Sequence, residues 1–173
     1  MPYDQHCIEC PYFNQKHLPP NQQTTRSSPP VELEANGSNT LLVFQAPGNI
    51  EWDKGLAIQP TKKKGGSGGA RIAQSWQRSG KQRTDFDIIN AVQCFPGIFG
   101  ERDDPPSPQA KACCAKRLKA VLLVGNYLKV IPFGDVARET LNSLLKETGQ
   151  APTVPTIRHP NGAVEKSDLD AVW

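Results

Sequence analysis

The five cysteines of this chain fall into two groups that lie far apart in the sequence. Cys7 and Cys10 form a C-x-x-C near the N-terminus, whereas Cys94 and the pair Cys113 and Cys114 follow much later. An isolated C-x-x-C can be a redox pair, but one that is joined by two later cysteines is more typical of a four-thiolate metal site. The spacing therefore predicts a metal site that ties the N-terminal segment to the body of the domain.

The length of 173 residues suits one domain with a single hydrophobic core. Sixteen prolines and fourteen glycines indicate that much of the chain forms loops. Residues 14–38 are rich in Gln, Thr, Ser, Pro and Asn, which is typical of an extended connector. We therefore expect a single domain over 1–173, made of an N-terminal metal half-site (1–13), this connector (14–38) and an α/β core (39–173).

The sequence also limits where the protein can reside. It has no apolar run long enough to span a membrane, and its first residues lack the charged and apolar regions of a signal peptide. The odd number of cysteines argues against a complete disulfide framework. These features predict a cytoplasmic protein with reduced thiols.

Short apolar runs that end in turn residues predict four strands, at residues 40–44, 86–92, 129–133 and 154–157. Helical spacing and helix-start signals predict helices over 70–78, 108–124 and 134–146. Because strands alternate with helices, the pattern predicts an α/β fold, namely a three-layer α/β/α sandwich around a central, mostly parallel four-stranded sheet.

Four residues of functional interest lie at or just beyond the ends of these predicted strands: Gln45, Asn90, Gly134 and His159. Open parallel sheets bind their ligands at the carboxyl ends of the strands. The coincidence therefore predicts a functional site at that edge of the sheet.

The net charge is only +3, but positive residues cluster in one part of the sequence. A run of three lysines leads into a glycine-rich stretch, and further basic residues follow at Arg71, Arg78, Lys81 and Arg83. Such a cluster suits a phosphate backbone, although a solvated surface is the more common meaning of a charge run.

Several motifs resemble, in order, those of one enzyme superfamily. The sequence Phe-Gln-Ala-Pro-Gly at 44–48 resembles a Gly-Glu-Ala-Pro-Gly motif, and residues 66–69 resemble the glycine-rich turn that follows it. The stretch 89–94 resembles a strand that carries a base-reading asparagine and then a cluster cysteine, and 154–160 resembles a segment that ends in His-Pro. On these motifs the chain is similar to the uracil-DNA glycosylase superfamily, above all to its iron–sulfur branches, families 4 and 5.

The resemblance implies a [4Fe–4S] cluster with a structural role beside the DNA-binding loops. Its ligands would be Cys7, Cys10, Cys94 and Cys114, with Cys113 as the alternative fourth ligand. Four thiolates also suit a structural zinc ion, so zinc stays open as the other metal.

The resemblance further implies that a base flips out of DNA into a pocket, where its glycosidic bond is hydrolysed. Asn90 would read the pyrimidine edge, because an amide offers both a donor and an acceptor. His159 would donate a hydrogen bond to the departing base, which gains negative charge.

The first motif departs from the family, because Gln45 stands where family 4 has a glutamate. A glutamine can orient a water molecule but cannot act as a general base. Glu51 and Asp53 are nearby carboxylates that could activate the water or stabilise the oxocarbenium-like sugar.

The pocket wall departs as well, because the family's Pro-Phe pair is missing. We expect Gly48 and Trp52 to contact the base, with Trp52 supplying the stacking surface. Without that ring the pocket would be wider and could admit a larger, modified pyrimidine.

Three segments are expected to contact DNA. The loop that holds Lys62, Lys63, Lys64 and Ser67 suits phosphates, as does the helix start at Gly134. Arg158 and Asn161 resemble a segment that enters the minor groove. The wedge there is small, which points to single-stranded DNA or to a duplex with an already flipped base.

Taken with the resemblance, these residues predict a monomeric, monofunctional DNA glycosylase that acts on uracil or a modified pyrimidine and leaves an abasic site. Three alternatives stay open: a glycosylase for a bulky hypermodified cytosine in phage DNA, a non-catalytic DNA-binding module on the same scaffold, and a zinc-stabilised structural domain.

Overall fold

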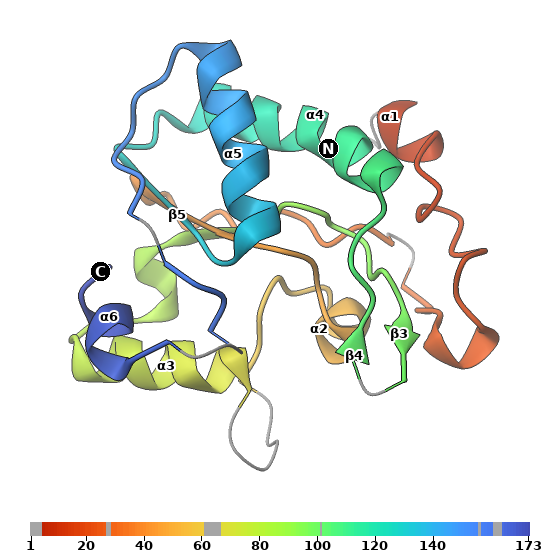
Figure 1. Cartoon of the computed structure of the whole chain (residues 1–173), viewed down its shortest axis with the longest axis horizontal. Coiled ribbons are helices and arrows are strands. Elements are labelled where there is room, and N and C mark those ends of the chain that lie inside the picture. Colours follow the sequence, from red (N-terminus) through yellow and green to blue (C-terminus); the bar gives the residue numbers. More distant parts are fainter. Residues whose placement is uncertain (1–4, 27–28, 61–66, 101, 156, 161–163) are drawn as a thin grey trace.

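The computed structural model describes residues 5–26, 29–60, 67–100, 102–155, 157–160 and 164–173. Its centre is a parallel sheet with the strand order β2-β1-β5, formed by β1 (Thr40–Phe44), β2 (Asp87–Asn90) and β5 (Lys129–Pro132). The α/β class and three of the predicted strands are therefore confirmed. In Figure 1, α4 and α5 lie on one side of this sheet and α3 and α6 on the other.

The central strand β1 is buried on both faces, as a continuous apolar run predicts for a parallel sheet. Leu41 and Val43 belong to one core cluster, which includes apolar residues of α4 and α5. Leu42 and Phe44 point the other way and belong to a second cluster, which includes Trp52, residues of α3 and the C-terminal segment. The period of two along β1 thus fixes which helices cover which face.

The predicted fourth strand at 154–157 is not confirmed as a member of the sheet, and residue 156 lies outside the described residues. Thr153 forms only an isolated parallel bridge to Lys129, in which its N–H donates to Leu128 O at 3.0 Å and its carbonyl accepts from Val130 N–H at 2.9 Å. Pro152 and Pro155 flank this position, and proline has no N–H to extend a hydrogen-bonded ladder. The sheet therefore has three strands in the part of the chain that the structure describes.

The three predicted helices are confirmed as α3 (Gly68–Arg78), α4 (Pro108–Gly125) and α5 (Asp135–Thr148). Ser67 and Ser107 cap α3 and α4, because each hydroxyl accepts the N–H of the residue three positions later, at 3.1 and 3.2 Å. No helix in the described ranges is both long and apolar enough to cross a membrane.

Several short elements have no counterpart in the sequence prediction. They are α1 (Gln5–Ile8), α2 (Asn49–Lys54), α6 (Lys166–Asp170), the 3-10 turns η1 (Pro20–Gln22) and η2 (Arg83–Asp85), and the hairpin of β3 (Ile98–Phe99) with β4 (Arg102–Asp103). α1 packs against α4 (Figure 1), so the N-terminal segment is attached to the body of the protein.

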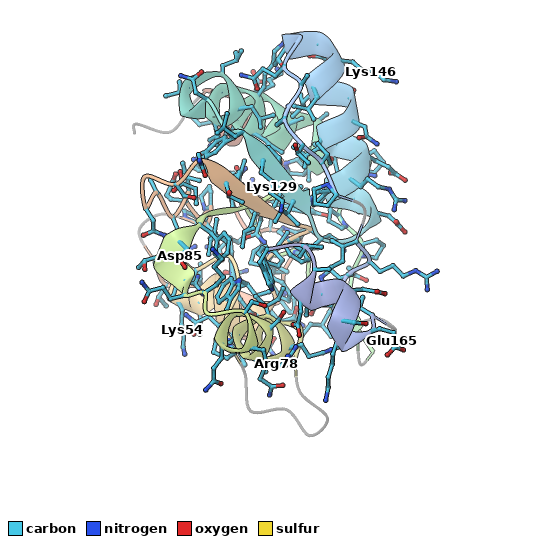
Figure 2. All side chains as sticks on the ribbon, turned by 90° about the vertical axis from the view of Figure 1, so that its left-hand side faces the viewer. Lys54, Arg78, Asp85, Lys129, Lys146 and Glu165 are labelled. Carbon is cyan, nitrogen blue, oxygen red and sulfur yellow. The ribbon has the colours of Figure 1, made fainter. Side chains whose placement is uncertain are left out.

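The predicted connector packs along the sheet where the structure describes it. Glu34 and Ile88 exchange backbone hydrogen bonds of 2.9 and 3.0 Å, and Val31 is fully buried. Several charged side chains lie on the outside: Lys54, Arg78, Lys146 and Glu165 project from the rim of the molecule in Figure 2. The buried strands between the helices thus form a rigid frame for the polar residues at the strand ends.

Candidate functional site

The carboxyl ends of the three strands meet at one edge of the sheet, as parallel strands must. Asn90 is the last residue of β2, while Gln45 follows β1 directly and Gly134 lies two residues beyond β5. Backbone hydrogen bonds fix this register, since Val92 N–H donates to Gln45 O at 2.9 Å. We call the group formed by Gln45, Asn90, Gly134 and His159 the strand-end site.

Asn90 is the most unusual residue of the strand-end site because it is polar and 0% exposed. Its Nδ2 donates to Ala57 O at 3.1 Å, but its Oδ1 is buried and has no hydrogen-bond partner among the described residues. Leaving a buried acceptor unpaired costs about 1–3 kcal/mol, so such an atom needs an explanation. A ligand that donates a hydrogen bond would supply the missing partner.

His159 joins the strand-end site through a contact with Gly134. A Cβ built on Gly134 would lie 3.2 Å from both Cβ and Cδ2 of His159, and Gly134 has a φ of +92°. Only glycine combines that backbone with so close an approach. Burial lowers the pKa of His159 below its ordinary value, so its imidazole is neutral at pH 7.

The two candidate carboxylates differ in where they point. Glu51 lies in the first turn of α2, and its Oε1 accepts the N–H of Gln59 at 3.2 Å. Its Oε2 would lie 2.9 Å from a Cβ built on Gly48, so the carboxylate is folded back over Gly48. Asp53 is exposed. Glu51 therefore faces the loop that follows β1, and Asp53 does not share that position.

Asp103 is a third carboxylate in this region, and no motif of the sequence indicates it. Its Oδ2 would lie 3.5 Å from the same Cβ position on Gly48 that Glu51 approaches. Asp103 is part of β4, in a stretch whose sequence indicates a loop insertion and has no motif. Only the hairpin brings it beside Gly48.

Trp52 is placed differently from the role expected for it. Its side chain is 0% exposed, and the guanidinium of Arg26 lies 5.4 Å from the centroid of its ring. The ring therefore belongs to the core, and the surface expected to stack on a base is covered by protein. Gln45 and Gly48 are both half-buried.

The residues expected to contact DNA have varied surroundings. Ser67 caps α3, and Gly134 is the N-cap residue of α5, whose first residue, Asp135, pairs with Arg138 at 2.7 Å. Arg158 is exposed. The remaining predicted contacts lie outside the described residues: Lys62, Lys63, Lys64 and Asn161.

Three arginines of the predicted basic cluster make contacts within the protein. Arg71 donates to the carbonyls of Pro160 and Val164, next to His159. Arg78 pairs with Asp170 at 2.7 Å and Arg83 with Glu34 at 2.6 Å. These arginines therefore have structural partners, and the phosphate-binding role suggested for the cluster does not rest on them.

The cysteines gather at the other end of the loop that follows β2. Cys7, Cys10, Cys94 and Cys114 are each at most 5% exposed, no disulfide joins any of the five cysteines, and all five line one cavity. We call this cavity, which Arg117 also lines, the thiol cavity. The structure thus brings together the four predicted metal ligands, together with Cys113, which is half-buried.

The thiols of the cavity differ in acidity. A hydrogen bond from Cys114 is the main reason that the pKa of Cys10 falls to about 6, whereas burial raises the pKa of Cys94. No three His, Cys, Asp or Glu side chains of the described part of the chain converge on one point that could hold a metal ion; the thiols line a shared space instead. Soft sulfur ligands select zinc or iron–sulfur clusters, so the donor set fits either group.

Comparison with known proteins adds no assignment. No protein-family model matches the chain, and no curated protein sequence matches it significantly. The roles of the strand-end site and of the thiol cavity therefore rest on the motifs and on the geometry of the residues themselves.

Proposed function

We propose that this protein is a monofunctional DNA glycosylase that hydrolyses the N-glycosidic bond of uracil or a modified pyrimidine and leaves an abasic site. The observation that carries the proposal is the unpaired Oδ1 of Asn90, a fully buried acceptor at the strand-end edge of a parallel sheet. A flipped pyrimidine would bring a ring N–H or an exocyclic amine to this oxygen. Without such a ligand, the oxygen has no hydrogen-bond donor among the described residues.

His159 supports the proposal because its protonation state suits leaving-group stabilisation. A neutral imidazole donates one hydrogen bond, which can stabilise the negative charge that develops on the departing base. Gly134 holds the ring against the end of β5, and Arg71 fixes the carbonyls of Pro160 and Val164 that follow it. The donor is thus held against Gly134, just beyond the end of β5.

The sugar side of the reaction needs a negative charge or an oriented water molecule. We assign this role to Glu51, because its carboxylate folds back over Gly48, whereas Asp53 is exposed. Gln45 can orient the water through its amide but cannot accept its proton.

The proposed metal centre is a [4Fe–4S] cluster, with zinc as the alternative, held by Cys7, Cys10, Cys94 and Cys114. Such a group would supply structural cross-linking between α1, α4 and the loop after β2. Gln93 connects this region to the strand-end site, because its backbone N–H donates to Cys114 and its Nε2 donates to Asn90 O at 3.2 Å. The metal centre would therefore support the strand end that reads the base.

The proposed partner is DNA, either single-stranded or with a base already flipped, bound as a monomer on an α/β/α scaffold. Arg158 is exposed beside His159 and suits a phosphate. A bulky hypermodified cytosine of phage DNA is the second candidate substrate. The burial of Trp52 favours it, because the aromatic wall expected to close a uracil-sized pocket is not available.

Release of free base tests the proposal directly. Purified protein would be incubated with single-stranded and duplex DNAs that carry uracil or phage-type modified cytosines, and free base and abasic sites would be quantified. We expect base release without strand cleavage, a large loss in Glu51→Gln and little change in the matched control Asp53→Asn. If no DNA yields free base although the protein binds DNA, the chain is a binding module and the enzyme proposal is wrong.

A further inference from the structure

Arg117 is the only charged residue that lines the thiol cavity in the described part of the chain. It lies on α4, three residues after Cys114 and four after Cys113, so all three share one face of the helix. Its side chain is 17% exposed, far less than is usual for an arginine. The helix therefore places a buried positive charge among the thiols.

Only one end of the Arg117 guanidinium has a hydrogen-bond partner among the described residues. Nη2 donates to Glu32 Oε2 at 2.7 Å, whereas Nη1 is buried and makes no hydrogen bond to any described residue. A buried donor of a charged group is costly to leave unpaired. The cavity that Arg117 lines holds the atoms that could complete it, because sulfur ligands carry negative charge when they bind a metal.

We propose that Arg117 is a positioning and charge-neutralising residue of the metal centre, with Nη1 donating to a metal-bound sulfur while Glu32 holds Nη2. This inference rests on the metal centre proposed above. Four thiolates leave a net negative charge around either Zn²⁺ or a [4Fe–4S]²⁺ core. A guanidinium that donates to such a site stabilises it by charge and by a directed hydrogen bond.

The proposal has two measurable consequences. Loss of the charge weakens retention of the metal, because the negative site loses its compensating donor. In an iron–sulfur centre it also lowers the reduction potential, because reduction adds one more negative charge. Removal of Glu32 has the opposite effect on the potential, since Arg117 then keeps its charge without a counter-charge.

The experiment compares Arg117→Gln and Arg117→Lys with the full-length protein, all prepared anaerobically with iron and zinc present. Lys119→Gln is the matched control, because Lys119 lies on the same helix in an exposed pair with Glu147 at 3.0 Å. Iron, sulfide and zinc per chain, loss of metal to a chelator and reduction potential would be measured. We expect about 10- to 100-fold weaker metal retention in Arg117→Gln, an intermediate loss in Arg117→Lys and none in Lys119→Gln.

Equal metal retention and equal potential in Arg117→Gln and the unmodified protein would overturn this inference and leave the metal centre standing. Unmodified protein that binds neither iron nor zinc would overturn both. If Arg117→Gln does not fold, Glu32→Gln decides: a raised potential in an iron–sulfur centre, or slower loss of metal to the chelator in a zinc centre, supports the role of Arg117, and no change contradicts it.

Discussion

The thiol cavity and the strand-end site both have an incomplete set of hydrogen bonds, but only in the thiol cavity does a charged group lack a partner. In the thiol cavity, two lining residues have a buried atom without a described partner: Nη1 of the charged Arg117, a donor, and Oε1 of the neutral Gln93, an acceptor. In the strand-end site the atom without a described partner is an acceptor, Oδ1 of Asn90. The first region therefore suits an electron-rich, anionic group, and the second suits a ligand that brings its own N–H.

The two regions also differ in what holds them together. The strand-end site is attached to a buried sheet whose register fixes Gln45 and Asn90. The thiol cavity joins α1, the loop after β2 and α4, and α1 has only four residues, too few to be stable as an isolated helix. We therefore expect the cavity to depend on its metal far more than the strand-end site does.

The largest expected effect is on the thiol cavity. Cys10→Ser should release the metal and lower the free energy of unfolding by more than about 4 kcal/mol, because loss of a structural metal is among the most damaging single changes. Calorimetry and metal analysis would measure it. Cys113→Ser is the matched variant and should keep the metal; if it loses the metal while Cys114→Ser keeps it, Cys113 is the fourth ligand.

An intermediate effect is expected at the strand-end site. Gly134 (φ +92°, ψ 170°) and Gly149 (φ +65°, ψ 12°) flank α5, but only Gly134 has a neighbour, His159, within 4 Å of a built Cβ. Gly134→Ala should cost about 1–3 kcal/mol and reduce base release by displacing His159. Gly149→Ala should destabilise the protein less and leave base release unchanged. Equal base release in the two variants would mean that His159 has no role in catalysis.

The smallest expected effect concerns pH and involves His159 of the strand-end site and His17, which lies near the thiol cavity. Burial lowers the pKa of His159, and it also lowers that of His17, whose Nε2 donates to Phe95 O at 2.9 Å next to Cys94. The unfolded chain therefore binds more protons than the folded one, so stability is full above about pH 6.5 and falls as the pH drops below it.

Substitution of either histidine tests this. His17→Gln and His159→Gln should each reduce the loss of melting temperature between about pH 7 and 5. Only His159→Gln should also change the pH profile of base release. If the pH profile of base release shifts in His17→Gln but not in His159→Gln, the catalytic role assigned to His159 is wrong.

The elements with strong local signals could be predicted from the sequence. β1 and β5 are continuous apolar runs, and α4 begins at Pro108 after a serine. The predicted fourth strand is not confirmed, and the prolines beside its apolar residues cannot donate to a hydrogen-bonded ladder. The short helices α1, α2 and α6 form through tertiary packing, and their few residues carry no periodic pattern.

The sequence could predict those site residues whose position follows from the order and direction of the strands alone. Asn90 and Gly134 lie at the same edge of the sheet because parallel strands end there, and the cysteine spacing indicates which segments come together. In the sequence, nothing distinguishes Arg117 from a surface arginine, because its burial depends on the tertiary contacts of α4 and on its pair with Glu32. Asp103 lies in an apparent insertion, which carries no motif. Trp52 was expected to face a base, yet the packing of α2 buries it beneath Arg26.

The central claim is that Asn90 reads a flipped base. The most direct test compares Asn90→Ala with the unmodified protein in base release and in DNA affinity, with Asn142→Ala, an exposed asparagine on α5, as the control. We predict that base release falls by at least about 100-fold in Asn90→Ala while DNA affinity is nearly unchanged. Unchanged base release, or an equal loss of base release and DNA affinity, would contradict the assignment.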